Sequence, residues 1–77
     1  MPKLFKTDAA DIYKILNGIY FALTDKGNFI VIQKGDKHFI EAYDGTLNEA
    51  CIDYEVSRPI YIGLRCPAGY FKNLEER

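Results

Sequence analysis

The chain has 77 residues, of which 48% are hydrophobic and 27% charged, and its net charge is −1. This composition is ordinary for a folded protein and argues against intrinsic disorder. A net charge so close to zero gives no overall field that would attract nucleic acid or anionic lipid. We therefore expect one small domain over residues 1–77, near the size limit for a core without disulfides or metals.

The composition also bears on compartment. No apolar run approaches the ~18 residues needed to cross a bilayer, and residues 1–6 carry charge without the apolar stretch of a signal peptide. These features predict a cytoplasmic protein, or a protein of the host cytoplasm if the source is a virus. The two cysteines, Cys51 and Cys66, lack a CxxC spacing. They are either free thiols or a disulfide pair, and the sequence leaves both open.

The first predicted element is a helix over residues 8–16. Asp8 suits its N-cap, and Asp8 and Asp11 place negative charge at the positive end of the helix dipole. Glycine accepts the left-handed conformation of a C-cap, so Gly18 suits the end of this helix. Apolar residues recur at the spacing of one buried helical stripe: Ala9, Ile12, Tyr13 and Leu16.

A β-hairpin is predicted next, with strands at 19–24 and 29–33 around a turn at 25–28. Pairing Thr24 with Phe29 makes both faces of this hairpin apolar, although a sheet in water normally hides only one. We expect the N-terminal helix to cover the first face. The first face carries Ile19, Phe21, Leu23, Ile30 and Ile32. The second face carries Tyr20, Ala22, Thr24, Phe29 and Val31.

A second turn at 34–37 leads to a third predicted strand at 38–43. Gly35 stands at the first central position, where a type II′ turn requires glycine. The resulting pairing places Ile40 beside Phe29 and Val31, and Phe39 beside Ile32. Both apolar faces therefore continue into the third strand.

Residues 47–56 fit two patterns. Thr46 and Glu49 form a capping box, and the apolar residues that follow fit a helical stripe from 47 to 54. The same residues alternate between apolar and polar from 50 to 56, which is typical of a strand. We favour the helix because two independent helix signals coincide there.

The C-terminal part contains one further strand. Residues 60–65 are rich in β-branched and aromatic side chains, and Pro67 lies at the favoured second position of a turn at 66–69. Residues 71–77 form a charged tail expected to fray, with Tyr70 and Phe71 docking before it does so. The predicted fold is α+β: a four-stranded antiparallel meander with the N-terminal helix on one face and a short second helix before the last strand. The alternative is a five-stranded β-barrel with one helix, if residues 50–56 form a strand.

Residues suited to catalysis are sparse. His38 is the only histidine, and its position at a turn–strand boundary predicts an exposed residue. His38, Cys51 and Cys66 have no metal-ligand spacing, since a zinc site needs four ligands or three plus water. Carboxylates and glycines fall at expected caps and turns, with no spacing typical of acid–base chemistry or phosphate binding. We therefore expect no enzyme activity, no metal and no cofactor.

The second apolar face carries the functional prediction. It is either further core or the interface with another protein, because large apolar patches rarely stay exposed. The interface interpretation predicts a non-enzymatic protein-interaction module, a homodimer or the binder of another protein. Small regulators and inhibitors encoded by phages and mobile elements have this size and lack of chemistry. The candidate interface residues are Tyr20, Phe29, Val31, Ile40 and Tyr61.

A nucleic-acid-binding sheet is the alternative function. Three aromatic residues, Tyr20, Phe29 and Tyr61, could stack single-stranded bases if they shared one exposed face. Nearby cations would then contact phosphates: Lys26, Lys34, Lys37 and Arg65. The lysines lie at predicted turns, however, where charge ordinarily serves solubility and guards sheet edges. The protein-interaction module is therefore favoured.

Overall fold

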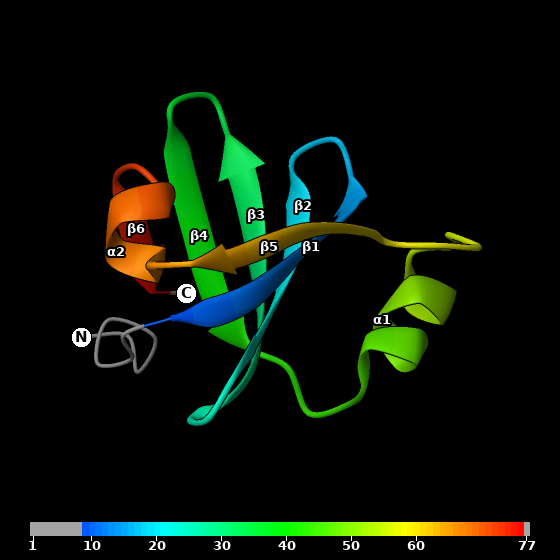
Figure 1. Cartoon of the computed structure of the whole chain (residues 1–77). Helices are drawn as coiled ribbons and strands as arrows, with labels where there is room; N and C mark the ends of the chain where they lie inside the picture. Colours follow the sequence, from blue (N-terminus) through cyan, green and yellow to red (C-terminus); the bar gives the residue numbers. More distant parts are fainter. Residues whose placement is uncertain (1–8, 77) are drawn as a thin grey trace.

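The computed structural model describes residues 9–76 and shows a six-stranded sheet in the order β5-β1-β2-β3-β4-β6 (Figure 1). The strands are β1 (Ala10–Leu16), β2 (Ile19–Thr24), β3 (Gly27–Lys34), β4 (Lys37–Ala42), β5 (Ile60–Arg65) and β6 (Leu74–Glu76). The helices are α1 (Leu47–Asp53) and α2 (Pro67–Tyr70). All neighbouring strands are antiparallel except β4 and β6, which are parallel. The predicted four-stranded antiparallel meander with two helices is therefore wrong.

The largest error concerns the predicted N-terminal helix. Residues 10–16 form β1, which pairs with β2 on one side and β5 on the other. Ile12 packs on one face of the sheet and Ile15 on the opposite face. A strand buried on both faces can imitate helical spacing, because its apolar residues need not alternate. Asn17 and Gly18 form the β1–β2 turn, with Gly18 at φ 80°, and Asn-Gly is the strongest short hairpin signal. Asp8 lies outside the described residues.

The two predicted turns have different outcomes. The β2–β3 turn is two residues shorter than expected, because Thr24 pairs with Gly27 instead of Phe29. A shift of two residues keeps every side chain on its face, so the prediction of two apolar faces is confirmed. The β3–β4 turn is as expected: Lys34 pairs with Lys37, and Gly35 has φ 64°.

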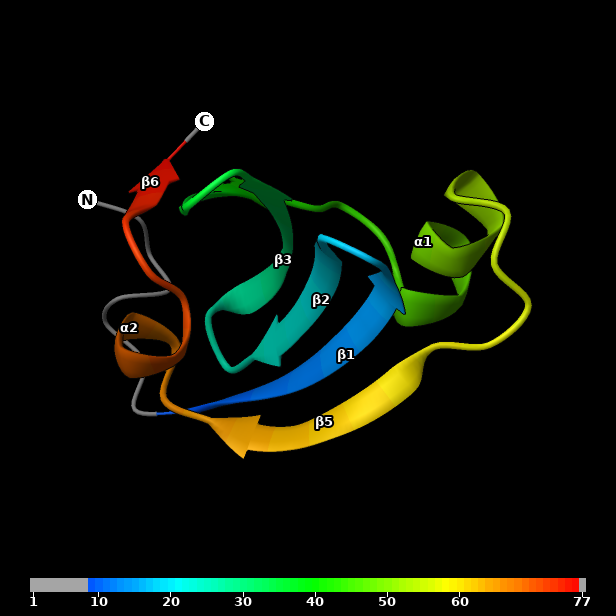
Figure 2. The same cartoon turned by 90° about the horizontal axis from the view of Figure 1, so that it is seen from above.

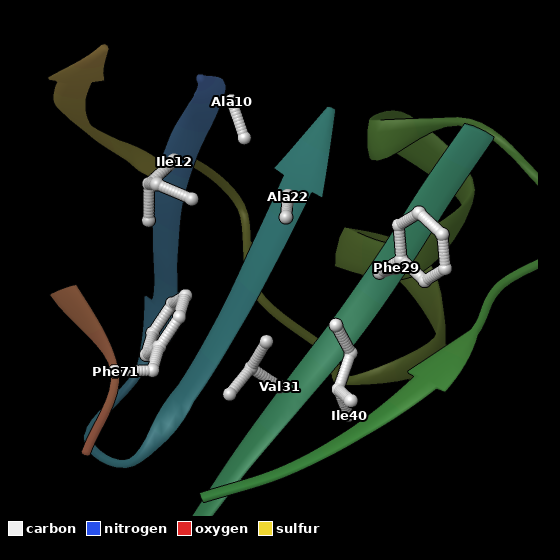
Figure 3. Packing of buried hydrophobic residues seen from close by; sticks show 7 residues of the cluster. All are labelled: Ala10, Ile12, Ala22, Phe29, Val31, Ile40 and Phe71. Carbon is white, nitrogen blue, oxygen red and sulfur yellow. The ribbon is translucent and has the colours of Figure 1, made fainter. Parts of the chain in front are cut away.

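The sheet is strongly bent and encloses the larger core, which we call the inner cluster (Figures 2 and 3). Phe71, from the segment after α2, points toward the strand residues of this cluster (Figure 3). Tyr20, Ile62 and Leu74 pack against it, so every strand contributes at least one side chain. Its members are Ala10, Ile12, Ala22, Phe29, Val31, Ile40 and Phe71.

Helix α1 covers the opposite face over a second core, the outer cluster. Ala50 of α1 is completely buried there, and Leu47 packs against the same group. Thr46 and Glu49 make both hydrogen bonds of the capping box, at 3.0 and 3.2 Å. The helix prediction is therefore confirmed, and the strand alternative for residues 50–56 is wrong. The buried members of the outer cluster are Ile15, Phe21, Ile30 and Ala50.

The C-terminal segment is part of the sheet. Helix α2 links the two edge strands β5 and β6 (Figure 2). Phe71 is buried, with its ring centroid 5.6 Å from Tyr20 and 5.3 Å from His38. Strand β6 then pairs with β4, and Lys37 forms a 3.4 Å salt bridge with Glu75. Docking of Phe71 agrees with the prediction, whereas residues 74–76 form a strand where a frayed tail was expected.

Candidate functional site

The five predicted interface residues do not form one surface. Phe29, Val31 and Ile40 are buried in the inner cluster, and Tyr20 packs against it half-buried. Tyr61 instead lies beside Tyr13 of the outer face, with ring centroids 5.0 Å apart, and is 54% exposed. The second apolar face is thus core of the same chain. Of the five residues, Tyr61 is the exposed one.

This placement also affects the aromatic set of the nucleic-acid alternative. Tyr20 and Phe29 belong to the inner face of the bent sheet, and Tyr61 belongs to the outer face. Phe29 is buried. The three rings therefore do not form a shared stacking platform, which that alternative required.

The most exposed apolar side chains of the sheet lie on β5. Ile60, Tyr61 and Leu64 are 63%, 54% and 65% exposed. Leu64 and Leu23 both pair with Asp11 of β1, so these three residues form a row across β5, β1 and β2. Leu23 was expected under a helix but is exposed, because α1 packs elsewhere on this face. We call the outer-face group Leu23, Tyr61 and Leu64 the β5 surface.

A bulge gives β5 its unusual side-chain pattern. Ile12 pairs with Gly63 while the next residue, Tyr13, pairs with Tyr61, so Ile62 is an extra residue in β5. Ile62 packs against the inner cluster, and Gly63 has φ 127°. The bulge therefore places Tyr61 and Leu64 on the same outer face although they lie three positions apart.

Strand β5 is also an edge of the sheet. Among the described strands its one partner is β1, so its other side presents free backbone N–H and C=O groups. Its first five residues carry no charge, and Arg65 ends it. Such an edge is a template for pairing with another strand.

Tyr61 is held in place by Asp11. Its hydroxyl donates a 2.7 Å hydrogen bond to the Asp11 carboxylate, and this bond raises the pKa of the Tyr61 phenol. An open groove of about 450 Å³ lies beside this pair, and Asp11, Leu23 and Leu64 are among its lining residues. Asp25 lines it too, so the apolar surface has acidic residues beside it.

The position of His38 was wrongly predicted. It is 9% exposed, and its Nδ1 lies 2.8 Å from the carbonyl oxygen of Lys72. Because a carbonyl oxygen only accepts, Nδ1 carries the proton and donates it. The sequence held no signal for this contact, since it depends on the pairing of β4 with β6.

The described residues include no group of three or more His, Cys, Asp or Glu arranged to hold a metal ion. Cys51 is buried and Cys66 is exposed, and both are free thiols. Within residues 9–76 neither helix is long and apolar enough to cross a membrane. Comparison with known protein families, curated proteins and solved structures finds no match. The exposed side chains of the β5 surface are therefore the feature from which a function is inferred.

Proposed function

We propose that this chain is a small, non-enzymatic protein-interaction module of the cytoplasm that forms a homodimer through the free edge of β5. The observation that carries the proposal is the exposure of Ile60, Tyr61 and Leu64 on an edge strand that pairs with β1 on one side and has no partner strand on the other among residues 9–76. Soluble proteins usually protect such edges with charge, proline, β-bulges or very short strands. Strand β5 has a bulge at Ile62, but its first five residues carry no charge or proline. Pairing with a second chain would also cover the free edge of β5. A role as a regulator or inhibitor fits a module of this size.

A second copy of the chain fits this edge because the strand is self-complementary. Two β5 strands running antiparallel about a two-fold axis between Ile62 and Gly63 would place Tyr61 opposite Leu64 of the other copy. The bulge has already brought these two side chains to one face, so each contact would occur twice. The five uncharged residues face no like charge in this arrangement. Backbone hydrogen bonds would join the two sheets into one.

The pairing leaves the inner cluster untouched. Phe29, Val31 and Ile40 remain core in each protomer, and the contact moves to β5, where Tyr61 alone of the predicted interface residues lies. Tyr61 suits an interface because its aromatic ring supplies a large contact area. Its hydrogen bond to Asp11 fixes the ring before binding, which reduces the entropy lost on association.

Analytical ultracentrifugation of three proteins tests the proposal. The wild type is expected to sediment as a dimer at tens of micromolar, as a weak dimer would. The Leu64→Lys variant is expected to sediment as a monomer, because the pairing would desolvate two lysine ammonium groups. Ile52→Lys is the matched control, since Ile52 is 73% exposed on α1. It should dimerise like the wild type. A monomeric wild type at about 1 mM, or equal loss in both variants, contradicts the proposal.

A further inference from the structure

We infer that the pocket beside His38 binds a small aromatic carboxylate. The pocket has a volume of about 340 Å³ and is bounded by strands β2, β3 and β4, by the last residue of α2 and by the segment that follows it. This site is separate from the proposed dimer edge, because no residue of β5 lines it. Its lining residues are Tyr20, Gln33, His38, Tyr70, Phe71 and Lys72.

The orientation of His38 points to a ligand. Its imidazole is held by the hydrogen bond from Nδ1 to the Lys72 carbonyl and by the ring of Phe71 at 5.3 Å. The other nitrogen, Nε2, has no hydrogen-bond partner among the described residues. No buried side-chain nitrogen or oxygen of residues 9–76 lacks a partner, so the unpartnered Nε2 is an accessible atom, and His38 is one of the residues that line the pocket. An imidazole fixed by one nitrogen presents the other in a defined direction.

The groups around Nε2 favour a negatively charged ligand. Gln33 pairs with His38 across β3 and β4, so the two side chains lie next to each other. The amide of Gln33 donates a long 3.4 Å bond to the Gly35 carbonyl, which leaves donor capacity for a ligand. Lys72 adds a positive charge, and none of the lining residues is acidic. Glu75 of the adjacent strand β6 forms a salt bridge with Lys37.

The walls of the pocket favour an aromatic ring on that anion. Tyr20 and Tyr70 each make edge contacts with Phe71, with centroids 5.6 and 4.9 Å apart. Three aromatic rings therefore border a space near the lower end of the usual range for small-ligand pockets. A ring packed there would bring its carboxylate to Nε2 of His38, the amide of Gln33 and the ammonium of Lys72.

An NMR titration with two probes tests the inference. Benzoate should shift the ring signals of His38 and the side-chain amide of Gln33 in a saturable way. Benzamide has the same ring without the charge, and its affinity should be about tenfold lower, because a charge-assisted hydrogen bond is replaced by a neutral one. Equal affinities for benzoate and benzamide would mean that the pocket does not recognise the charge, and would contradict the inference. The absence of saturable shifts up to about 20 mM benzoate would overturn the site, since fragments of this size bind with millimolar affinity.

Matched lysine variants separate a local effect from general charge. Lys72→Gln removes the cation that lines the pocket, and the exposed position of Lys72 makes a folding defect unexpected. Benzoate affinity should fall by a factor of about five. Lys26→Gln removes an exposed lysine from the β2–β3 turn and should leave the affinity unchanged. Equal losses in the two variants would mean non-specific attraction and would contradict the inference.

Discussion

The hydroxyl of Tyr61 donates a hydrogen bond to the carboxylate of Asp11 at 2.7 Å, across 50 positions of sequence. The bond ties the edge strand β5 to β1 on the outer face of the sheet. It also raises the pKa of the Tyr61 phenol, because the protonated hydroxyl is the donor. Tyr61, the aromatic member of the β5 surface, therefore has its ring fixed before a partner binds.

Removing this hydroxyl should weaken the proposed dimer without unfolding the protomer. Tyr61→Phe keeps the ring and loses the bond to Asp11, so the ring must be ordered on association. We expect the dimer dissociation constant to rise about fivefold, the value of one hydrogen bond near 1 kcal/mol. Sedimentation equilibrium measures it. Tyr43→Phe removes a comparable bond to Asp53 at α1 and should leave dimerisation unchanged. An equal effect of both variants would contradict the role of Tyr61.

Tyr43 should make stability depend on pH in the alkaline range. Its hydrogen bond to Asp53 raises the pKa of the phenol from 10.0 to about 12. The raised pKa means that the folded state favours the protonated phenol. The contribution of Tyr43 to the free energy of unfolding is therefore complete below pH 10 and is lost as pH rises through about 12. The free energy of unfolding, measured in urea, should therefore fall further for the wild type than for Tyr43→Phe. Parallel curves for the two proteins would exclude this linkage.

Truncation should distinguish the inner cluster from the β5 surface. Phe29→Ala leaves a cavity in the core and should lower the free energy of unfolding by about 3–5 kcal/mol. Leu64→Ala removes an exposed side chain and should change it by less than about 0.5 kcal/mol. Urea unfolding at a concentration where the protein is monomeric compares the two. A small effect at Phe29 would mean that the second face of the hairpin is not core.

Sequence patterns predicted the elements whose signals are local. The capping box of Thr46 and Glu49 marked α1, and Gly35 marked the β3–β4 turn. The apolar residues of β1 fitted a helix because both faces of the strand are covered, which depends on bending of the whole sheet. Strand β6 has three residues, too few for a periodic pattern. His38 was wrongly predicted for a related reason, since Phe71 and Lys72, which contact its ring, are brought there by the segment that leads into β6.

The candidate site was predicted only through Tyr61. A hairpin with two apolar faces has to be covered twice, and the sequence does not say by what. Bending of the sheet covers the inner face and α1 covers much of the outer one, which leaves β5 as the exposed edge. The exposure of the β5 side chains thus follows from the tertiary structure and could not be predicted. That residues 60–65 form a strand was evident from their sequence.

The two cysteines should differ in reactivity. Cys66 is exposed at the start of α2, and Cys51 is a buried residue of α1. We expect one thiol equivalent to react quickly with a disulfide reagent in the native protein and the second only on unfolding, because access limits the thiolate. Cys66→Ser should abolish the fast phase and Cys51→Ser should retain it. Two fast equivalents in the wild type would contradict burial of Cys51.

Gly45 should be intolerant of a side chain although its backbone is unstrained. A Cβ atom there would lie 2.7 Å from Cε2 of Tyr43, well inside van der Waals contact. The ring of Tyr43 would have to move from its edge contact with Phe21 and from its hydrogen bond to Asp53. Gly45→Ala is therefore expected to lower the free energy of unfolding by about 1–3 kcal/mol, the usual cost of overpacking.

Gly69→Ala is the matched control for that variant. A Cβ atom at Gly69 would meet no atom within 4 Å, and alanine restricts the unfolded chain more than glycine does, so stability should stay equal or rise by up to about 1 kcal/mol. Thermal unfolding followed by near-ultraviolet circular dichroism reports both the stability and the packing of Tyr43. Because the displaced ring is the cause of the loss, Gly45→Ala combined with Tyr43→Ala should be less destabilised than the sum of the two single variants. Additive losses would place the clash elsewhere.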